Sequence, residues 1–458
     1  MQQDQRAERL VTIFLDVALP LADAYAATQS SFRWSGEDRA LVVAGTRIPI
    51  DSLSHVYLVG AGKAGVPMAR AVVDTLRLNE DLWARFAGGT VNVYRDQSEA
   101  SVPGVTFFPA DHPNPNQASV DGARAALALL STATSGDLVV AVISGGGSSL
   151  LTLPQAGICL DDFRAANRAL VTGGATIQEI NTVRKHLSQV KGGRLRMAAP
   201  DALFVTLILS DVIGDDLSSI ASGPTVPDPT TCGDAISVLE RHGLWARIPE
   251  SCQTHLLRGD SGEVDRAILW RDRLSPRTHN VVVASNAVVL SSLERLLSSP
   301  GQGGAASRVS LDATPVTGPV ETAVEEHFAR AVAASHTPGT LLLYGGEPVV
   351  SVPPDAHGTG GRMLHYALLS ARRIAGRDWA VLASGTDGID GTSPSAGAVV
   401  TGTTMATAHT HGLDADRYLE AFDSYGFFRT LEERSGVRCL INTGPTGTNV
   451  NDIMLWSL

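Results

Sequence analysis

The stretch VYLVGAGKAG, residues 56–65, decides the fold class. Its first half is a continuous run of apolar and β-branched residues, which is typical of a strand buried on both faces. Its second half spaces Gly60, Gly62 and Gly65 as G-x-G-x-x-G, and a helical pattern follows. That spacing usually indicates dinucleotide binding, but a lysine inside the turn, Lys63, is not what a pyrophosphate needs. The motif alone therefore leaves the ligand open.

The same arrangement of strand and polar loop recurs along the chain. The other examples are DLVVAVISGGGSS from residue 137, LFVTLILSDVIGDD from 203, NVVVASNAV from 280, TLLLYGGEP from 340, WAVLASGTDGIDG from 379 and CLINTGPTGTNVND from 439. Helical patterns of ten or more residues separate many of them, which predicts parallel strands with crossover helices and an α/β fold. In such sheets ligands bind beyond the carboxyl ends of the strands, where these loops fall.

Length and composition limit the class of protein. A chain of 458 residues with 44% hydrophobic and 18% charged residues predicts two or three globular domains. The least strand-like region, residues 228–276, places a boundary near its end, so we expect domains 1–275 and 276–458. The net charge of −11 disfavours nucleic acid and anionic membranes as partners. Four scattered cysteines and the absence of a signal-peptide pattern predict a cytoplasmic protein.

The loop ISGGGSSL, residues 143–150, is the strongest candidate for anion binding. Three consecutive glycines, Gly145, Gly146 and Gly147, allow backbone N–H groups to converge on one point, and Ser144 and Ser148 add hydroxyl donors. The alternative is a tight turn between strand and helix. Because a turn needs fewer than three glycines, we favour the anion cradle.

Other loops supply carboxylates, amides and cations. Asp211 in SDVIGDD and Asp387 in GTDGIDG could contact a divalent cation or a substrate hydroxyl, and Asn449 in GPTGTNVND could donate hydrogen bonds. The alternative in each case is a polar turn or a helix cap. Lys63, Lys185 and Arg362 each lie near glycines or small residues, which favours phosphate or carboxylate binding over a solvated surface charge. No metal site can be assigned.

Taken in order, the motifs VGAGKAG, DHPNPN, ISGGGSSL, INTVRKHLS, KGGRL, LSDVIGDD, GGEP, GTGGR, GTDGIDG and GPTGTNVND resemble those of the type-2 glycerate kinases. The resemblance runs from about residue 10 to the end. It implies a larger Rossmann-like N-terminal α/β domain, a smaller mixed α/β C-terminal MOFRL domain and an active site in the cleft between them. It leaves a homodimer open.

The resemblance also implies a reaction. Members of the family transfer the γ-phosphoryl group of ATP, with Mg²⁺, to the 2-hydroxyl of D-glycerate, and their catalytic lysine and arginine fall on Lys63 and Arg362. Phosphoryl transfer needs mainly positioning and charge neutralisation, which suits these two cations. The cradle would then bind a phosphate or the glycerate carboxylate.

The sequence departs from the family pattern beside Arg362. Where the family commonly has Asn-Gln-Glu, this chain has Met363-Leu364-His365, and its GGE motif continues with Pro348-Val349. If those positions face the site, each lost hydrogen bond to a hydroxy acid costs about 1–3 kcal/mol and the substrate could differ. Three hypotheses follow: a kinase of D-glycerate or a related 2-hydroxy acid, an NAD(P)H-dependent hydroxypyruvate reductase, and a paralogue that binds a small acid without turning it over.

Overall fold

The computed structural model describes residues 2–263, 275–299 and 308–458. By packing, the chain divides into two compact units, each with its own core. The large unit is Ala24–Val283, and the small unit combines Met1–Asp23 with Ala284–Leu458. The first 23 residues, which we expected in the N-terminal domain, thus pack with the small unit. Part of the expected boundary region, residues 264–274, lies outside the described residues, and the division at 275/276 stays a prediction.

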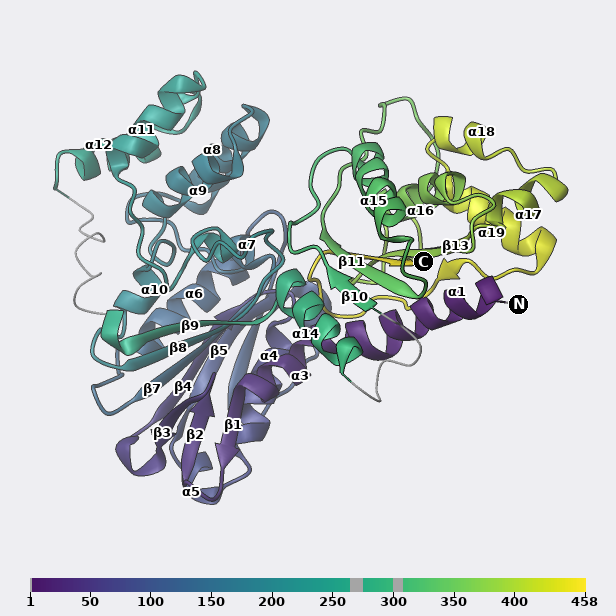
Figure 1. Cartoon of the computed structure of the whole chain (residues 1–458). Coiled ribbons are helices and arrows are strands. Elements are labelled where there is room, and N and C mark those ends of the chain that lie inside the picture. The colour runs from purple at the N-terminus through teal and green to yellow at the C-terminus, as the bar shows by residue number, and fades with distance from the viewer. Residues whose placement is uncertain (1, 264–274, 300–307) are drawn as a thin grey trace. The chain divides into compact units, whose positions relative to one another are not determined.

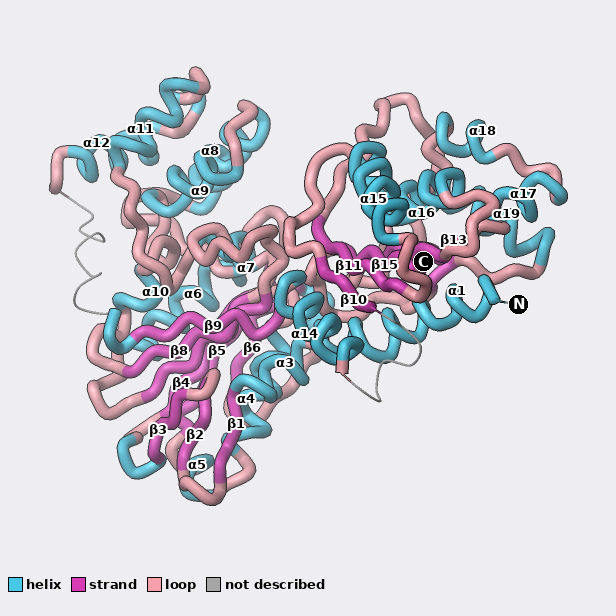
Figure 2. The backbone as a smooth tube through the Cα atoms, in the orientation of Figure 1, coloured by secondary structure: helices cyan, strands magenta, loops and turns pink. Residues whose placement is uncertain are grey.

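A six-stranded sheet forms the centre of the large unit (Figure 2), in the order β6-β5-β4-β7-β8-β9. The strands are β4 Val56–Ala61, β5 Phe86–Tyr94, β6 Val105–Ala110, β7 Leu138–Ile143, β8 Leu203–Leu209 and β9 Thr278–Ala284. The first five are paired in parallel, as the apolar runs predicted. A separate antiparallel sheet contains β1 Phe32–Ser35, β2 Ala40–Val43 and β3 Thr46–Pro49.

Helices connect and cover these strands (Figure 1). They are α3 Ala24–Ser31, α4 Gly65–Leu76, α5 Glu80–Trp83, α6 Gln117–Leu130, α7 Gly147–Leu150, α8 Leu160–Thr172, α9 Ile177–His186, α10 Arg194–Met197, α11 Cys232–Arg241 and α12 Glu250–Asp260. Helix α6 buries Ala123 and Leu130 against Val139 and Phe204 of the sheet. Helices α8, α9, α11 and α12 share a second core of their own around Phe163, Leu239 and Leu256.

The small unit contains a mixed sheet in the order β10-β11-β15-β12-β13-β14. Its strands are β10 Arg308–Leu311, β11 Thr340–Gly346, β12 Ala380–Gly385, β13 Gly397–Thr401, β14 Leu440–Ile441 and β15 Asp452–Ser457. Strand β15 lies antiparallel between β11 and β12. The expectation of parallel strands is therefore wrong for this sheet. The alternative of a helix entry after GPTGTNVND is also wrong, because that loop leads directly into β15.

Helices of both sequence ends build the rest of the small unit. They are α1 Gln2–Thr12, the π-helical turn η1 Ile13–Ala18, α2 Leu19–Ala22, α14 Asn286–Ser298, α15 Val320–Ala334, α16 Arg362–Arg373, α17 Thr404–Thr410, α18 Ala415–Glu420 and α19 Ser424–Ser435. Helix α1 packs on β12 and β13. Among the described helices none is by itself long and apolar enough to cross a membrane, whereas the bent pair Gln3–Ala22 and Ala24–Ser31 passes by length and composition.

A buried polar network fixes helix α16 against strand β15. The Tyr366 hydroxyl accepts a hydrogen bond from Trp456 Nε1 at 2.8 Å and lies 2.5 Å from His327 Nδ1. Burial lowers the pKa of His327 to about 3, so its ring is neutral. The Tyr366 hydroxyl, which accepts from Trp456, can then donate its hydrogen bond to Nδ1 of that ring. Because Arg362 begins the helix that Tyr366 anchors, the network also fixes the start of α16.

Replacing Tyr366 with phenylalanine should lower the free energy of unfolding of the small unit by about 1–3 kcal/mol, because it leaves the buried Trp456 N–H without an acceptor. Denaturant unfolding followed by tryptophan fluorescence measures the loss. Tyr418→Phe is the matched control, since that half-buried ring packs on Phe427. Equal stabilities of the two variants would contradict the role of the network.

Candidate active site

The first candidate site lies where the strand order of the large sheet reverses. From β4 the chain proceeds to β5 and β6 on one side, and then to β7, β8 and β9 on the other. This is the 3-2-1-4-5-6 order of dinucleotide-binding folds, in which ligands bind between the loops that follow the two central strands. Those loops are the GKAG turn after β4 and the SGGGSS loop after β7.

The GKAG turn has every backbone N–H already bound within the protein. Gly62 N donates to Asn92 O at 3.1 Å and Lys63 N to Gly145 O at 2.9 Å. Ala64 N donates to Ser144 Oγ at 3.0 Å, and Gly65 N closes the turn on Gly62 O. The turn is therefore locked to its neighbours and offers no N–H group to a phosphate.

The SGGGSS loop has the opposite character. In the described part of the chain the N–H groups of Gly145, Gly146 and Ser148 have no backbone or side-chain acceptor, and all three residues are half-buried. Gly146, the residue before helix α7, has a φ of +81°, a left-handed backbone conformation that glycine adopts without strain. We refer to these three N–H groups as the anion cradle that the glycines predicted; that they bind an anion stays a prediction.

Lys63 lies directly over this cradle. Its side chain crosses Gly146, where an added β-carbon would lie 3.3 Å from Lys63 Cγ. Lys63 is exposed, and its ammonium has no ion pair within the described residues. His112, from the loop after β6, contacts the same face of Gly146. Burial, and then the charge of Lys63, lower the pKa of His112, so its ring is neutral at pH 7.

Asp211, which follows β8, brings a carboxylate to the edge of the cradle. A β-carbon on Gly145 would lie 2.1 Å from Asp211 Oδ2, so only glycine permits this approach. The loops after β7 and β8 thus meet at Gly145 and Asp211, and a contact of Asp211 with a cation or a substrate hydroxyl stays a prediction. The same motif's Asp216 instead caps a turn by accepting from the N–H and hydroxyl of Ser218.

Lys185 has a buried partner. Its ammonium lies 3.5 Å from Asp228 Oδ1, and the side chains of both residues are at most 7% exposed. The charge of Lys185 is therefore compensated inside the unit, unlike that of Lys63. Whether it contacts a phosphate stays a prediction.

The second candidate site lies at one end of the small sheet, around Arg362. The first residue of β15, Asp452, is paired with both Gly346 and Gly385, the last residues of β11 and β12. Arg362 Nε and Nη2 donate to the two oxygens of Asp452, and Nη1 donates to Glu347 Oε1 at 2.9 Å. Burial alone would lower the pKa of Arg362, but the carboxylates of Asp452, Glu347 and Asp390 together raise it above its ordinary value. The guanidinium is thus permanently charged and held in one plane.

Two further acids surround this arginine. Asp390 accepts from the N–H groups of Met363 and Leu364, which caps helix α16, and burial raises its pKa to about 6. Asp387 lies beside Gly385, close to Asp452. Asn449 Oδ1 accepts from Asn451 N at 2.9 Å, which shapes the loop that enters β15. Within the described residues, no group of three or more His, Cys, Asp or Glu side chains has metal-binding geometry.

Met363, Leu364 and His365 do not face the site. The first two are fully buried in the hydrophobic core of the small unit, and His365 is buried against the Phe422 ring at 5.8 Å between centroids. Our interpretation that these residues remove hydrogen bonds from a bound hydroxy acid is therefore wrong for this structure. The physical reason is that α16 is buried on nearly all sides, since every residue from 363 to 368 is buried.

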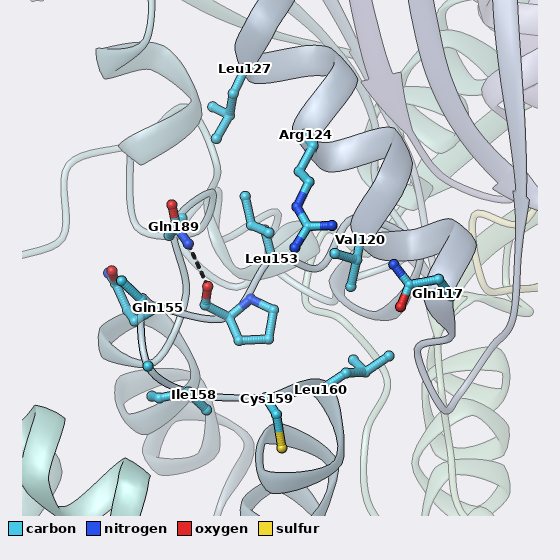
Figure 3. A pocket seen from close by; sticks show the side chains of 13 residues that line it. Gln117, Val120, Arg124, Leu127, Leu153, Gln155, Ile158, Cys159, Leu160 and Gln189 are labelled. Carbon is cyan, nitrogen blue, oxygen red and sulfur yellow. Dashed lines mark hydrogen bonds between the residues drawn. The ribbon is translucent and has the colours of Figure 1, made fainter.

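A separate cavity of about 550 Å³ lies between α6 and the segment 153–160 of the large unit (Figure 3). Apolar side chains and Arg124, Gln117, Gln155 and Gln189 line it. None of the predicted site residues is among them. Gln189 Nε2 donates to Pro154 O at 2.6 Å, so part of its polar lining is already paired.

One residue at these sites, Asp452, did not stand out in the sequence, whereas Lys191 belongs to the basic cluster of NTVRKHLSQVKGGRL without its position being predictable. Asp452 ends the GPTGTNVND motif, but nothing in its spacing showed that it would hold Arg362, 90 residues away. Lys191, in KGGRL, lies under the cradle. A signal for it was present: it is one of only three lysines in the chain, beside Lys63 and Lys185.

Comparison with known proteins identifies the class. A Rossmann-order sheet in one unit and a mixed sheet in the other define a two-unit α/β protein. Residues 11–257 match the model described as a domain of unknown function, DUF4147, and residues 340–452 match the MOFRL family. The chain belongs to the type-2 glycerate kinase family, in which these two parts are combined.

Individual relatives cover nearly the whole chain. A glycerate 2-kinase of Pyrococcus horikoshii is 36% identical over 96% of this chain and 94% of its own. The crystal structure of a glycerate kinase from Thermotoga maritima superimposes with a TM-score of 0.83 at 30% identity, covering 99% of this chain and all of that one. An Agrobacterium vitis protein named as a hydroxypyruvate reductase is 38% identical over 89% of this chain and 88% of its own.

Gly145→Ala should disrupt the large-unit site, because its β-carbon would overlap the carboxylate of Asp211. We expect a loss of stability of about 1–3 kcal/mol, as for other overpacked positions. Thermal unfolding measures it. Gly157→Ala serves as the control at an exposed turn, where a β-carbon has open space but a φ of +88° strains any side chain. A Gly145→Ala variant more stable than Gly157→Ala would contradict the close approach.

Lys63→Met should raise the pKa of His112, because it removes a like charge while the burial of the ring remains. The histidine ring resonances, followed by NMR over a pH titration and assigned with His112→Gln, measure the shift. An unchanged or lowered pKa would show that the Lys63 side chain does not lie beside His112.

Proposed function

We propose that this protein is a glycerate 2-kinase: it transfers the γ-phosphoryl group of ATP to the 2-hydroxyl of D-glycerate or a closely related 2-hydroxy acid. D-glycerate would give 2-phosphoglycerate. The names of the relatives in Pyrococcus horikoshii and Thermotoga maritima support the kinase class and the acceptor. The choice of ATP and of the 2-hydroxyl rests on the family resemblance.

One observation favours a kinase over a reductase. In dinucleotide-binding folds the pyrophosphate lies against N–H groups of the turn after the first strand. Here all four N–H groups of that turn, from Gly62 to Gly65, are bound within the protein. Among the described residues, the N–H groups without acceptors lie instead in the SGGGSS loop after β7. They lie beside Lys63, whose ammonium has no ion pair with any described residue. This arrangement suits a compact anion, such as a phosphoryl group, better than an extended dinucleotide.

Lys63 and the cradle would act on that anion together. The N–H groups of Gly145, Gly146 and Ser148 bind its oxygens, and the Lys63 ammonium neutralises the charge that develops during transfer. Phosphoryl transfer requires mainly such positioning and electrostatic stabilisation. The neutral ring of His112 adds no charge that competes with Lys63 for the anion.

The carboxylate of Asp211 fits a role for Mg²⁺. Mg²⁺ in nucleotide sites is commonly held by one or two carboxylates together with phosphate oxygens, so a preformed cage of three acids is not required. We propose that Asp211 holds the ion, which would neutralise charge on the phosphate oxygens when bound.

Arg362 is the second residue that we propose for catalysis. Asp452 holds its guanidinium on two donors, and Glu347, whose side chain is 45% exposed and also accepts from Asn451 Nδ2 at 3.3 Å, occupies the remaining edge. An anionic ligand can therefore displace Glu347 while Asp452 keeps the plane fixed. Asp387 and Asn449 lie on loops at the same end of the small sheet and are proposed to contact hydroxyl groups of the substrate.

A coupled assay of ADP release with ATP, Mg²⁺ and a panel of hydroxy acids tests this function. We expect ADP release that depends on D-glycerate. Lys63→Met and Arg362→Met should each lower kcat by about a hundredfold or more, the usual effect of removing one stabilising cation or donor. Arg429→Met is the control, because this exposed arginine has only a loose ion pair with Glu433 at 3.7 Å.

The other hypotheses predict different results from the same protein preparation. Oxidation of NADH by hydroxypyruvate without ATP would identify a reductase. Calorimetric binding of D-glycerate without turnover in either assay would identify a binding paralogue. Retention of full ADP release in Lys63→Met would refute the role of Lys63 within a kinase.

A further inference from the structure

Lysine is rare in this chain and confined to one region. Three of the 36 basic residues are lysines, at positions 63, 185 and 191, and the remainder are arginines. All three belong to the large unit. Lysine differs from arginine in carrying a compact ammonium with three donors on a flexible stem. The composition therefore directs attention to what Lys191, the lysine without an assigned role, does with its ammonium.

Lys191 is fully buried beneath the SGGGSS loop. Its Nζ donates to Ser148 O at 2.6 Å and to Leu151 O at 2.9 Å, and the residue is 1% exposed. These carbonyls belong to the short helix α7 and to the residue that ends it. One ammonium thus fixes the segment that carries Ser148, a residue of the cradle. Burial, and then the charge of Arg184, lower the pKa of Lys191 to about 7.

The residues that follow Lys191 hold a second segment against the same loop. Gly192 N donates to Ser222 O at 3.0 Å, and Gly193 N donates to Gly223 O at 2.7 Å. Ala221 and Ser222 have left-handed backbone conformations, with φ of 51° and 61°, which non-glycine residues adopt only when their surroundings impose them.

The strained segment also contacts the cradle directly. Ser222 Oγ lies 2.9 Å from Ser148 Oγ and donates to Asn181 Oδ1 at 2.9 Å. Because Asn181 accepts the Ser222 proton, the Ser148 hydroxyl donates to Ser222, and its oxygen keeps a fixed position at the cradle. The KGG segment therefore restrains Ser148 twice, through its carbonyl and through its hydroxyl.

We propose that Lys191 is a positioning residue that sets the geometry of the anion cradle without touching the bound anion. An ammonium on two carbonyls is a strong restraint, since hydrogen bonds to charged groups are about twice as strong as neutral ones. The inference rests on the proposed function only for the identity of the anion.

Two measurements on the whole protein test this role. Hydrogen exchange, which needs no substrate, reports on the N–H groups of Gly147, Ser149, Leu150 and Leu151, all of which are bound inside the loop. In Lys191→Met we expect their exchange to quicken by about tenfold to a hundredfold, the range for a lost charged hydrogen bond. In the ADP-release assay we expect the KM of the substrate whose anion binds in the cradle, ATP or D-glycerate, to rise by a similar factor. We expect kcat to fall less.

Arg196→Met is the matched control. Arg196 is another buried cation that donates to backbone carbonyls, those of Ala199, Pro200 and Ala202, none of which belongs to the SGGGSS loop. It should lower stability while leaving exchange in the loop and KM unchanged. An equal effect of the two variants on the loop would reduce Lys191 to a general packing role and overturn the proposal.

Lys191→Gln provides a second variant should the methionine variant not fold. Its amide retains two N–H donors on a shorter stem, and we expect part of the loop protection and part of the affinity for inorganic phosphate, followed by calorimetry. Unchanged exchange and unchanged phosphate affinity would overturn the proposal. Faster loop exchange in a protein that shows no ADP release even as the wild type would support the positioning role while refuting the proposed function.

Discussion

The large unit depends on the hydrogen bonds that join the two loops at its switch point. Lys63 N donates to Gly145 O, and Ala64 N donates to Ser144 Oγ. These bonds use up the donors of the first loop and bring the second loop under the Lys63 side chain. Within the described residues, the N–H groups of Gly145, Gly146 and Ser148 in the second loop have no acceptor. The two hydrogen bonds thus occupy the N–H groups of the turn after β4 and hold the proposed anion cradle next to that turn.

The two candidate sites manage their cations in different ways. Lys63 is exposed and without a partner, whereas Arg362 is held by Asp452 and Glu347. A lysine on a flexible stem can follow a group that moves between donor and acceptor, and a braced guanidinium can present a fixed plane. The other two lysines are buried: Lys185 is paired with Asp228, and Lys191 donates to backbone carbonyls. We therefore propose ligand contact for Lys63, which is exposed, and a supporting role for Lys191, which is buried.

Much of the fold followed from local sequence. The run at 56–61, the glycines after it and the helix from residue 65 were predictable because each depends on neighbouring residues only. The mixed sheet was not, since DIMLWS becomes the central strand β15 only by pairing with β11 and β12, more than 60 residues away. The interpretation of Met363 and Leu364 failed for a similar reason. Motif comparison gives their identity, but the burial of helix α16 on nearly all sides places them in the core.

The sequence by itself determined the α/β class, the family and the residue types of the anion cradle, because strand composition, glycine spacing and motif order are properties of short segments. Only the tertiary structure decided which N–H groups are unused, which acids meet Gly145 and Arg362, and that Lys191 lies beneath Ser148. Those facts depend on contacts between segments 40 to 90 residues apart. Such contacts arise from packing and burial, and no local pattern encodes them.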